Sequence, residues 1–236
     1  MSITINEVIN KLKNEKYISI SLIQREMGVG FILANKLFKE LEENGYLVKN
    51  QQNGRCLFSR EKLKEYGVIT KEGIKLLFLD VDGVLNCHST KDCCGPYRGI
   101  EDKKVALVKE IVDATGAKIV LVSSWKEWWY KEPHFKDKQD DLATYLDEKL
   151  AKQGLTIIDK TDDYNSFNRG EGIHEYIRRL KRRDVIVDDY VVLDDEMFDY
   201  KERKITKHLI QTSYYSHGLD KKHVAKAIKI LNKEQI

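Results

Sequence analysis

The stretch KLLFLDVDGVLN, Lys75–Asn86, contains the pattern that decides the fold. Its apolar run predicts a buried strand over Leu76–Asp80. Asp82 follows Asp80 at two residues' distance, and Gly83 lets the backbone turn sharply away. Two carboxylates at the end of a buried strand are costly unless a cation neutralises them. Oxygen ligands suit Mg²⁺, so we expect a magnesium site where one carboxylate attacks phosphorus and the other transfers a proton.

Downstream of residue 71, apolar strands alternate with helical segments. The predicted strands are Leu76–Asp80, Lys118–Val122, Thr156–Ile158 and Val191–Asp194, and the predicted helices are Lys103–Thr115, Asp141–Gln153, Gly172–Leu180 and Lys221–Leu231. This alternation is typical of a Rossmann-like α/β domain, in which helices cover both faces of a parallel sheet. Sites in such domains lie at the carboxyl ends of the strands, so other functional residues are expected there.

Polar residues do follow two more of the predicted strands. Ser123 and Ser124 end the strand IVLV, and a serine hydroxyl there can bind a phosphate oxygen. Asp194 and Asp195 end the strand VVL, and either one can bind the metal while the other braces a loop or a ligand. Arg169 precedes a predicted helix and can pair with a phosphate. Asp199, slightly further along, can assist through a water molecule.

These motifs resemble those of haloacid-dehalogenase-like (HAD) phosphohydrolases over most of residues 71–236. Within that superfamily the chain is most similar to the HAD domains of Swiss-Army-knife-type RNA repair proteins. The similar stretches are LDVDGVLN, TGAKIVLVSSWK, VVLDDEMFD and a late HGL. Lys126 stands where the family usually has Arg after Ser-Ser-Trp, and Arg169 takes the place of the usual lysine of the third motif.

The resemblance implies a magnesium-dependent phosphatase with defined roles for its acids. Asp80 would be the nucleophile that forms an aspartyl-phosphate. Asp82 would protonate the leaving oxygen and then activate water. Mg²⁺ would be bound by Asp80, the carbonyl of Asp82, and Asp195 or Asp194.

The resemblance also implies which residues bind the phosphoryl group. Ser123 would contact its oxygens, with Ser124 in that role if the register shifts by one residue. Arg169, helped by Lys126, would neutralise its charge. Trp125 and the aromatic residues after it, Trp128, Trp129 and Tyr130, either stack on the bases of a substrate or pack in the core and rim.

The segments between the motifs are too short for a full cap domain, so we expect a minimal cap over the HAD domain. An open site favours bulky phosphorylated substrates, such as the end of a DNA or RNA strand, a nucleotide or a phosphoprotein. Two other functions remain open. The chain could be a DNA-binding regulator whose HAD domain senses a phosphorylated ligand or mediates assembly, or a phosphotransferase that uses an acceptor other than water.

The first 70 residues predict a separate small domain, so the chain divides into residues 1–70 and 71–236. Its predicted elements are helices over Ile5–Leu12 and Phe31–Glu43, a helix between them that Ser21 caps together with Gln24, and strands Tyr46–Val48 and Cys56–Phe58 around an Asn53-Gly54 turn. This order is typical of a winged helix-turn-helix.

Ser19–Leu47 is similar to the gamma domain of FtsK-type DNA translocases, a winged helix that binds DNA. Ile32 and Leu33 replace the polar and basic residues that the family usually has after the turn. Asn35, Lys36 and Lys39 keep polar character on the third helix. They are the candidate nucleic-acid contacts, with protein contact, dimerisation or a plain solvated face as the alternatives.

The formal net charge of +3 falls entirely on residues 1–70, which contain 11 Lys and Arg against 8 Glu. This excess favours an anionic partner for that segment. No apolar stretch has the length of a signal peptide or of a membrane span, so a cytoplasmic location without membrane contact is expected.

The four cysteines predict free thiols, because no CxxC pair occurs and a chain of this length needs no disulfides. Cys87, His88, Cys93 and Cys94 are close enough in sequence to form a soft metal site, although their spacing matches no zinc finger. The alternative is that they are ordinary loop residues beside the active site.

Overall fold

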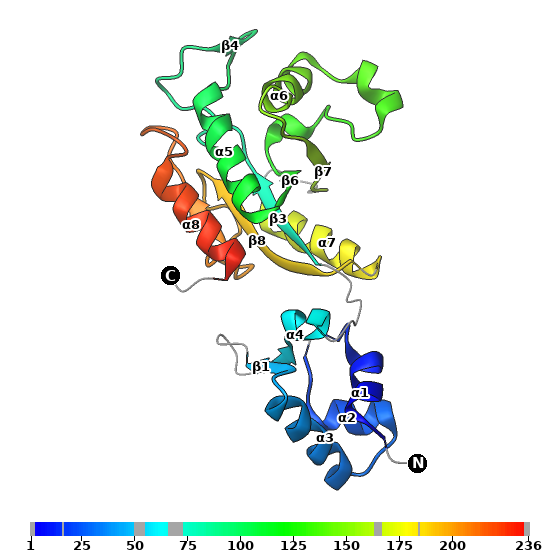
Figure 1. Cartoon of the computed structure of the whole chain (residues 1–236). Coiled ribbons are helices and arrows are strands. Elements are labelled where there is room, and N and C mark those ends of the chain that lie inside the picture. Colours follow the sequence, from blue (N-terminus) through cyan, green and yellow to red (C-terminus); the bar gives the residue numbers. More distant parts are fainter. Residues whose placement is uncertain are drawn as a thin grey trace. The chain divides into compact units, whose positions relative to one another are not determined.

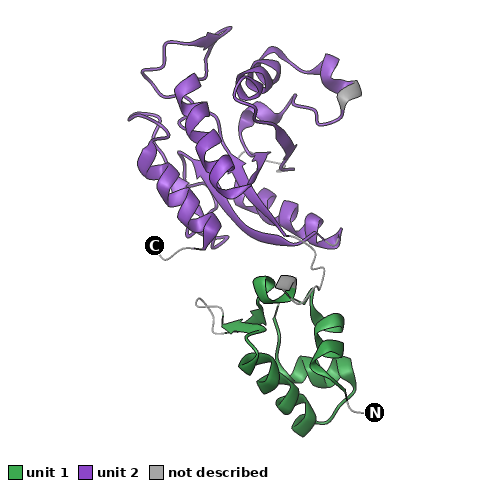
Figure 2. Ribbon diagram, in the orientation of Figure 1, with its two compact units in different colours: residues 1–72 green, residues 73–236 purple. Residues whose placement is uncertain are grey.

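The structure is a computed structural model that describes residues 3–15, 17–49, 55–65, 73–162, 167–183 and 185–233. The chain divides into two compact units, Met1–Glu72 and Gly73–Ile236 (Figure 2). Among the described residues, every helix is too short or too polar to cross a membrane.

The first unit consists of helices and one small antiparallel sheet (Figure 1). Its elements are α1 (Ile5–Leu12), α2 (Ile20–Met27), α3 (Phe31–Glu43), β1 (Leu47–Lys49), β2 (Cys56–Phe58) and α4 (Arg60–Glu65). The apolar faces of the helices share a core that includes Val8, Ile23 and Leu41. The predicted bounds of α1 and α3 are confirmed. The assignment of this unit as a winged helix-turn-helix stays a prediction, and the predicted Asn53-Gly54 turn lies outside the described residues.

The predicted cap of the second helix is wrong. Ser19, not Ser21, caps α2, because its hydroxyl accepts a hydrogen bond from the backbone N–H of Leu22 at 3.2 Å. Ser19 still has extended backbone angles, whereas Ser21 already lies within the helix.

The second unit contains the parallel sheet that the sequence predicts. Five strands are arranged in the order β7-β6-β3-β8-β9, and every pair is parallel. They are β3 (Ile74–Leu79), β6 (Lys118–Leu121), β7 (Ile157–Lys160), β8 (Val187–Asp194) and β9 (Leu209–Gln211). Leu79 lies level with Leu121 on one side and Leu193 on the other. The residues that follow these three central strands therefore meet at one edge.

Helices cover both faces of this sheet (Figure 1). They are α5 (Asp102–Thr115), α6 (Asp141–Ala151), α7 (Arg169–Arg182) and α8 (Lys221–Asn232). Along β3, Leu77 and Leu79 pack in one core with α5, α6 and α8, whereas Leu76 and Phe78 pack in a second core with α7. The four predicted helices are confirmed, and α7 begins three residues earlier than expected, at Arg169.

Several short elements were not predicted. They are β9, the first half of β8, the hairpin of β4 (Cys93–Cys94) and β5 (Tyr97–Arg98), and the 3-10 helices η1 (Ser124–Lys126) and η2 (Pro133–Lys138). The hairpin and both 3-10 helices lie in segments that leave the carboxyl ends of β3 and β6.

Candidate metal and phosphate site

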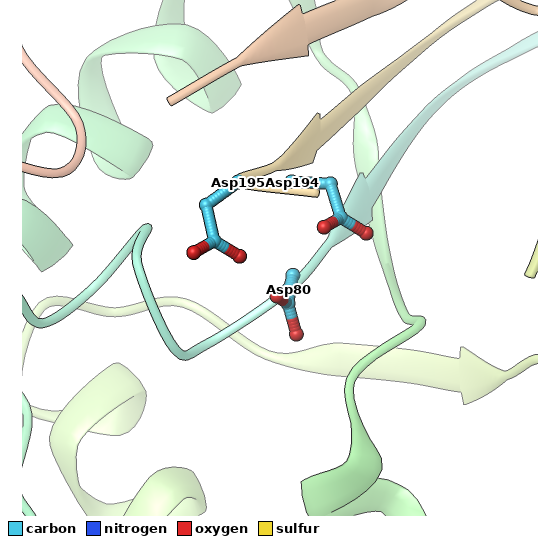
Figure 3. A group of neighbouring side chains, drawn as sticks. All are labelled: Asp80, Asp194 and Asp195. Atoms are coloured by element: carbon cyan, nitrogen blue, oxygen red, sulfur yellow. The ribbon is translucent and has the colours of Figure 1, made fainter. Parts of the chain in front are cut away.

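Three acidic side chains meet at the carboxyl ends of β3 and β8. Asp80, Asp194 and Asp195 each offer a carboxylate oxygen within 4.8 Å of the others. Figure 3 shows their carboxylates directed at a common space beyond the two strands. Asp80 and Asp194 are buried, at 2% and 0% exposure, and Asp195 is half-buried. The side-by-side pairing of β3 with β8 thus brings together residues more than a hundred positions apart in the sequence.

The negative charges of these carboxylates repel one another. Burial, together with the charge of Asp194, raises the pKa of Asp80 to about 7. Burial and then the charge of Asp80 raise the pKa of Asp195 to about 6, and burial also raises the pKa of Asp194. Oδ1 of Asp80 is buried and has no hydrogen-bond partner among the described residues. Three clustered carboxylates with an unsatisfied oxygen fit the ligand preferences of Mg²⁺.

Arg169 compensates part of this negative charge. Its Nη1 lies 2.7 Å from Oδ2 of Asp194 and 3.2 Å from Oδ2 of Asp80. The guanidinium is buried and stacks 4.2 Å above the ring of Phe198. This cation therefore bridges the acids of β3 and β8. It supplies one positive charge against the negative charges of three carboxylates.

Asp194 and Asp195 have different surroundings. Oδ2 of Asp194 accepts hydrogen bonds from Arg169 and from the Tyr200 hydroxyl, both at 2.7 Å, and Oδ1 accepts one from the backbone N–H of Glu196 at 3.0 Å. Among the described residues, no hydrogen bond from another residue reaches the Asp195 carboxylate. Asp194 thus acts as a brace for Arg169, and Asp195 has the less committed oxygens.

Asp199 fixes the helix that presents Arg169. Its two carboxylate oxygens accept hydrogen bonds from the backbone N–H groups of Gly170 at 2.7 Å and Glu171 at 3.1 Å. Asn168 gives α7 no side-chain cap, so this acid from the β8–β9 segment takes that place. The expected role of Asp199 through a water molecule stays a prediction, but both of its oxygens are engaged by the helix.

Asp82 lies outside the group of three acids and lines a neighbouring cleft. Its Oδ1 accepts a hydrogen bond from Asn86 Nδ2 at 2.8 Å, and its Oδ2 accepts one from the Trp125 indole at 2.9 Å. Asn86 is itself fixed, because its Oδ1 accepts from the backbone N–H of Gly83 at 3.0 Å. Trp125 is buried, so this contact holds the Asp82 carboxyl group in one orientation. Sequence reasoning missed Asn86, although it ends the stretch LDVDGVLN.

The residues after β6 lie beside this group. Ser123 is buried, and its hydroxyl opposes the rise in the pKa of Asp80 that burial causes. Ser124 is exposed. Lys126 donates from Nζ to the hydroxyl of Thr161 at 2.9 Å. The predicted phosphate-binding roles of these three residues stay predictions.

Gly83 makes room for the acid cluster, which gives a direct test. A Cβ at this position would lie 2.3 Å from the Asp195 carboxyl carbon, and the backbone φ is +71°. We expect Gly83→Ala to weaken Mg²⁺ binding at least about tenfold, because Asp195 must move. Isothermal titration calorimetry would measure this change.

Gly116→Ala is the matched control for that substitution. Gly116 has a similar φ of +70°, but a Cβ there would meet no atom within 4 Å. Its substitution strains the backbone without touching the acids, so Mg²⁺ affinity should be unchanged. Equal losses of affinity in the two variants would contradict the role of Gly83.

A comparison with protein families found one match. Residues 76–224, more than half of the chain, match the family described as the HAD domain in Swiss Army Knife RNA repair proteins. The chain belongs to this family. Searches of curated proteins and of solved structures found no match.

The HAD match runs from β3 to α8 and includes Asp80, Asp82, Arg169, Asp194 and Asp195. The N-terminal unit lies outside the match, so its similarity to the gamma domain of DNA translocases stays a prediction. The geometry also counts against a soft metal site at Cys87, His88, Cys93 and Cys94. Among the described residues, the three aspartates form the only group of His, Cys, Asp or Glu side chains with the spacing of metal ligands.

Proposed function

We propose that the chain is a Mg²⁺-dependent phosphatase that removes a phosphate from the end of a nucleic acid, from a nucleotide or from another bulky substrate. The observation that carries this proposal is the group of three carboxylates, two of them buried and paired with Arg169, at the carboxyl edge of a HAD sheet. Membership of a family found in RNA repair proteins favours nucleic-acid ends among these substrates.

Asp80 and Asp82 would perform the chemistry in two steps. A carboxylate oxygen of Asp80 forms a bond to phosphorus while the ester bond breaks, and Asp82 gives a proton to the leaving oxygen. In the second step Asp82 takes a proton from water, whose oxygen attacks the aspartyl-phosphate and frees Asp80. Asn86 and Trp125 keep the Asp82 carboxyl group on the side of the cleft where a leaving group can enter.

The remaining residues bind and neutralise the phosphoryl group. Mg²⁺, held by Asp80, Asp195 and the carbonyl of Asp82, would offset the negative charge that otherwise repels the attacking carboxylate. Arg169 adds a fixed positive charge, and Ser123, or Ser124 in its place, would donate a hydrogen bond to a phosphoryl oxygen. Lys126 would supply a second cation near the end of β6.

The N-terminal unit is proposed as a winged helix that recruits nucleic acid through α3. Lys36 and Lys39 are exposed one turn apart, and Asn35 is half-buried between them and the core. At the start of the same helix, Phe31 and Ile32 are 60% and 86% exposed. These apolar residues favour contact with the nucleic-acid backbone, or with a protein partner, over base-specific binding.

The phosphatase proposal predicts that activity depends on a divalent cation. The full chain would be incubated with Mg²⁺ and a chromogenic phosphate ester, nucleotides, and DNA and RNA phosphorylated at either end. We expect phosphate release to fall at least about 100-fold with excess EDTA and to return with excess Mg²⁺. Without the cation, the negative carboxylates repel the negative phosphate. Release is measured as inorganic phosphate.

Two outcomes of that panel would favour other functions. Tight binding of duplex DNA with no phosphate release on any substrate would support the regulator. Transfer of the phosphate to an added alcohol instead of water would support a phosphotransferase. Release that is indifferent to EDTA would contradict the metal site itself.

A further inference from the structure

In the second unit, the large exposed apolar side chains lie in segments that leave one edge of the sheet. Among its described residues, those with substantial exposure are Tyr97, Trp128, Phe167, Met197 and Tyr215. Each lies in the segment that follows a different strand, β3, β6, β7, β8 and β9 in turn. Because the strands are parallel, these segments all begin at the edge that carries the acid cluster. We call the five side chains the apolar rim.

This distribution points to a ligand. Single exposed apolar residues are normal on a protein surface, but their concentration around a site marks a binding region. The segments that lead back to the opposite edge of the sheet carry no such side chain among the described residues. The apolar rim is thus confined to the segments that leave the edge with the acids.

A cleft contains one residue of the rim, Tyr97, together with the proposed acid catalyst, Asp82. It has a volume of about 540 Å³ and is lined by Asp82, Cys93, Pro96, Tyr97, Arg98 and Tyr214. The ring of Tyr215 meets that of Tyr214 edge to face, with centroids 5.5 Å apart, and is itself 85% exposed. Aromatic surface therefore continues from the cleft beside Asp82 outward to solvent.

Arg98 gives this cleft a positive charge, and among the described residues it forms no ion pair with a carboxylate. Its Nε donates to the Tyr214 hydroxyl at 3.0 Å and its Nη1 to the carbonyl of Thr90 at 2.5 Å, and both partners are neutral. Asn86, which donates to Asp82, also donates to the carbonyl of Arg98 at 3.3 Å. The cation is thus held at a fixed place beside the site, where it favours an anion.

We propose that the apolar rim and Arg98 bind the single-stranded end of a polynucleotide. Unpaired bases stack on Tyr97 and Tyr215, and a backbone phosphate lies at Arg98. The terminal phosphate then reaches Asp80. This inference rests on the proposed phosphatase function and narrows its substrate class.

The same features count against other phosphorylated substrates. A small sugar phosphate would leave the rim unused. A phosphopeptide has few flat aromatic groups and no second phosphate for Arg98. In a duplex the base faces are stacked on one another, so successive bases cannot each meet a tyrosine ring.

Binding of unphosphorylated oligonucleotides tests this inference without any turnover. Fluorescence anisotropy would compare single-stranded RNA and DNA octamers with octamers of equal charge whose three terminal positions, at either end, are abasic. We expect the full chain to bind the base-containing octamers at least about tenfold more tightly, since a base stacked on an aromatic ring contributes roughly 1–3 kcal/mol. A blunt duplex should bind no better than the abasic strand.

Variants of the rim locate the effect. Tyr97→Ala and Tyr215→Ala should each weaken binding of the base-containing octamer about 5-fold or more and leave the abasic octamer unaffected. Tyr97→Phe keeps the ring and should bind like the wild type, whereas Tyr97→Leu keeps only apolar bulk and should not. Circular dichroism would show that each exposed-residue variant is folded.

Alkylation of Cys93 reports on binding in the cleft itself. It therefore distinguishes binding at the rim from binding at the N-terminal unit. It is a free, exposed thiol in the cleft wall. The base-containing octamer should slow its alkylation by iodoacetamide, followed by mass spectrometry, and the protection should disappear in Tyr97→Ala. Equal affinity for base-containing and abasic octamers, or unchanged alkylation of Cys93, would overturn the inference.

The proposed function has its own separate readout. Hydrolysis of the chromogenic ester by the wild-type chain tests the phosphatase and does not enter the binding comparison. If hydrolysis occurs and the abasic octamer binds equally well, only the rim proposal fails. If hydrolysis is absent while the base-dependent binding is found, the rim proposal stands and the phosphatase proposal fails.

Discussion

Replacing Asp80 by Asn is expected to lower phosphate release by at least about 1,000-fold, because the amide cannot form the bond to phosphorus. The substitution keeps the size and shape of the side chain. It removes the negative charge of one of the three clustered carboxylates. Release would be measured with Mg²⁺ and the chromogenic ester.

The same variant should be more stable than the wild type when no metal is added. In the folded protein, burial and the charge of Asp194 raise the pKa of Asp80 from its ordinary value to about 7. Asp80 therefore ionises at a lower pH in the unfolded chain than in the folded protein. The free energy of unfolding consequently falls as the pH rises toward 7. Asn removes this loss, so the melting temperature should increase more at pH 8 than at pH 5. Differential scanning calorimetry with EDTA would measure both values.

Asp113→Asn is the control for the loss of one negative charge. Asp113 lies exposed on α5, where it pairs with Lys109. Neither activity nor stability should change much, since exposed ion pairs contribute little. Asp80→Asn with more than a small fraction of wild-type activity would rule out Asp80 as the nucleophile.

The sequence was sufficient to predict the parallel sheet because its central strands are nearly pure apolar runs. Leu76–Leu79 and Ile119–Leu121 are buried on both faces of the sheet, and such runs leave little ambiguity. Asp80 and Asp194 could be predicted as neighbours since each directly ends such a run. Strand β9, with only three residues and one neighbour in the sheet, has no comparable pattern.

The residues that orient the site could not be predicted in the same way. Tyr200 and Asp199 act through contacts with Asp194 and with the first turn of α7, and the sequence does not state which helix turn faces which loop. The apolar rim could not be predicted for the same reason. Tyr97 and Tyr215 are separated by most of the domain in sequence, and only the parallel order of the strands brings their segments to one edge.

Arg169→Ala should destabilise the metal-free protein by about 3–5 kcal/mol, the cost of leaving buried carboxylates without their cation. Arg169 is the partner of both Asp80 and Asp194, and all three side chains are buried. Arg169→Lys keeps a positive charge in the same place, so its loss of stability should be smaller. Urea unfolding with EDTA would measure both, provided that two probes show the same transition.

Arg182→Ala is the control on the same helix. Arg182 is exposed and pairs with Glu175 at the surface, and such a pair contributes less than about 1 kcal/mol. A change of that size for Arg169→Ala would contradict the bridging role of Arg169.

Added Mg²⁺ separates the two roles of Arg169. A divalent cation among the acids offsets their mutual repulsion, so it should restore much of the stability that Arg169→Ala loses. It should not restore turnover, because Arg169 also supplies a fixed charge for the phosphoryl group. Recovery of both with saturating Mg²⁺ would mean that Arg169 only balances the charge of the acids. Recovery of stability alone would mean that it also takes part in the reaction.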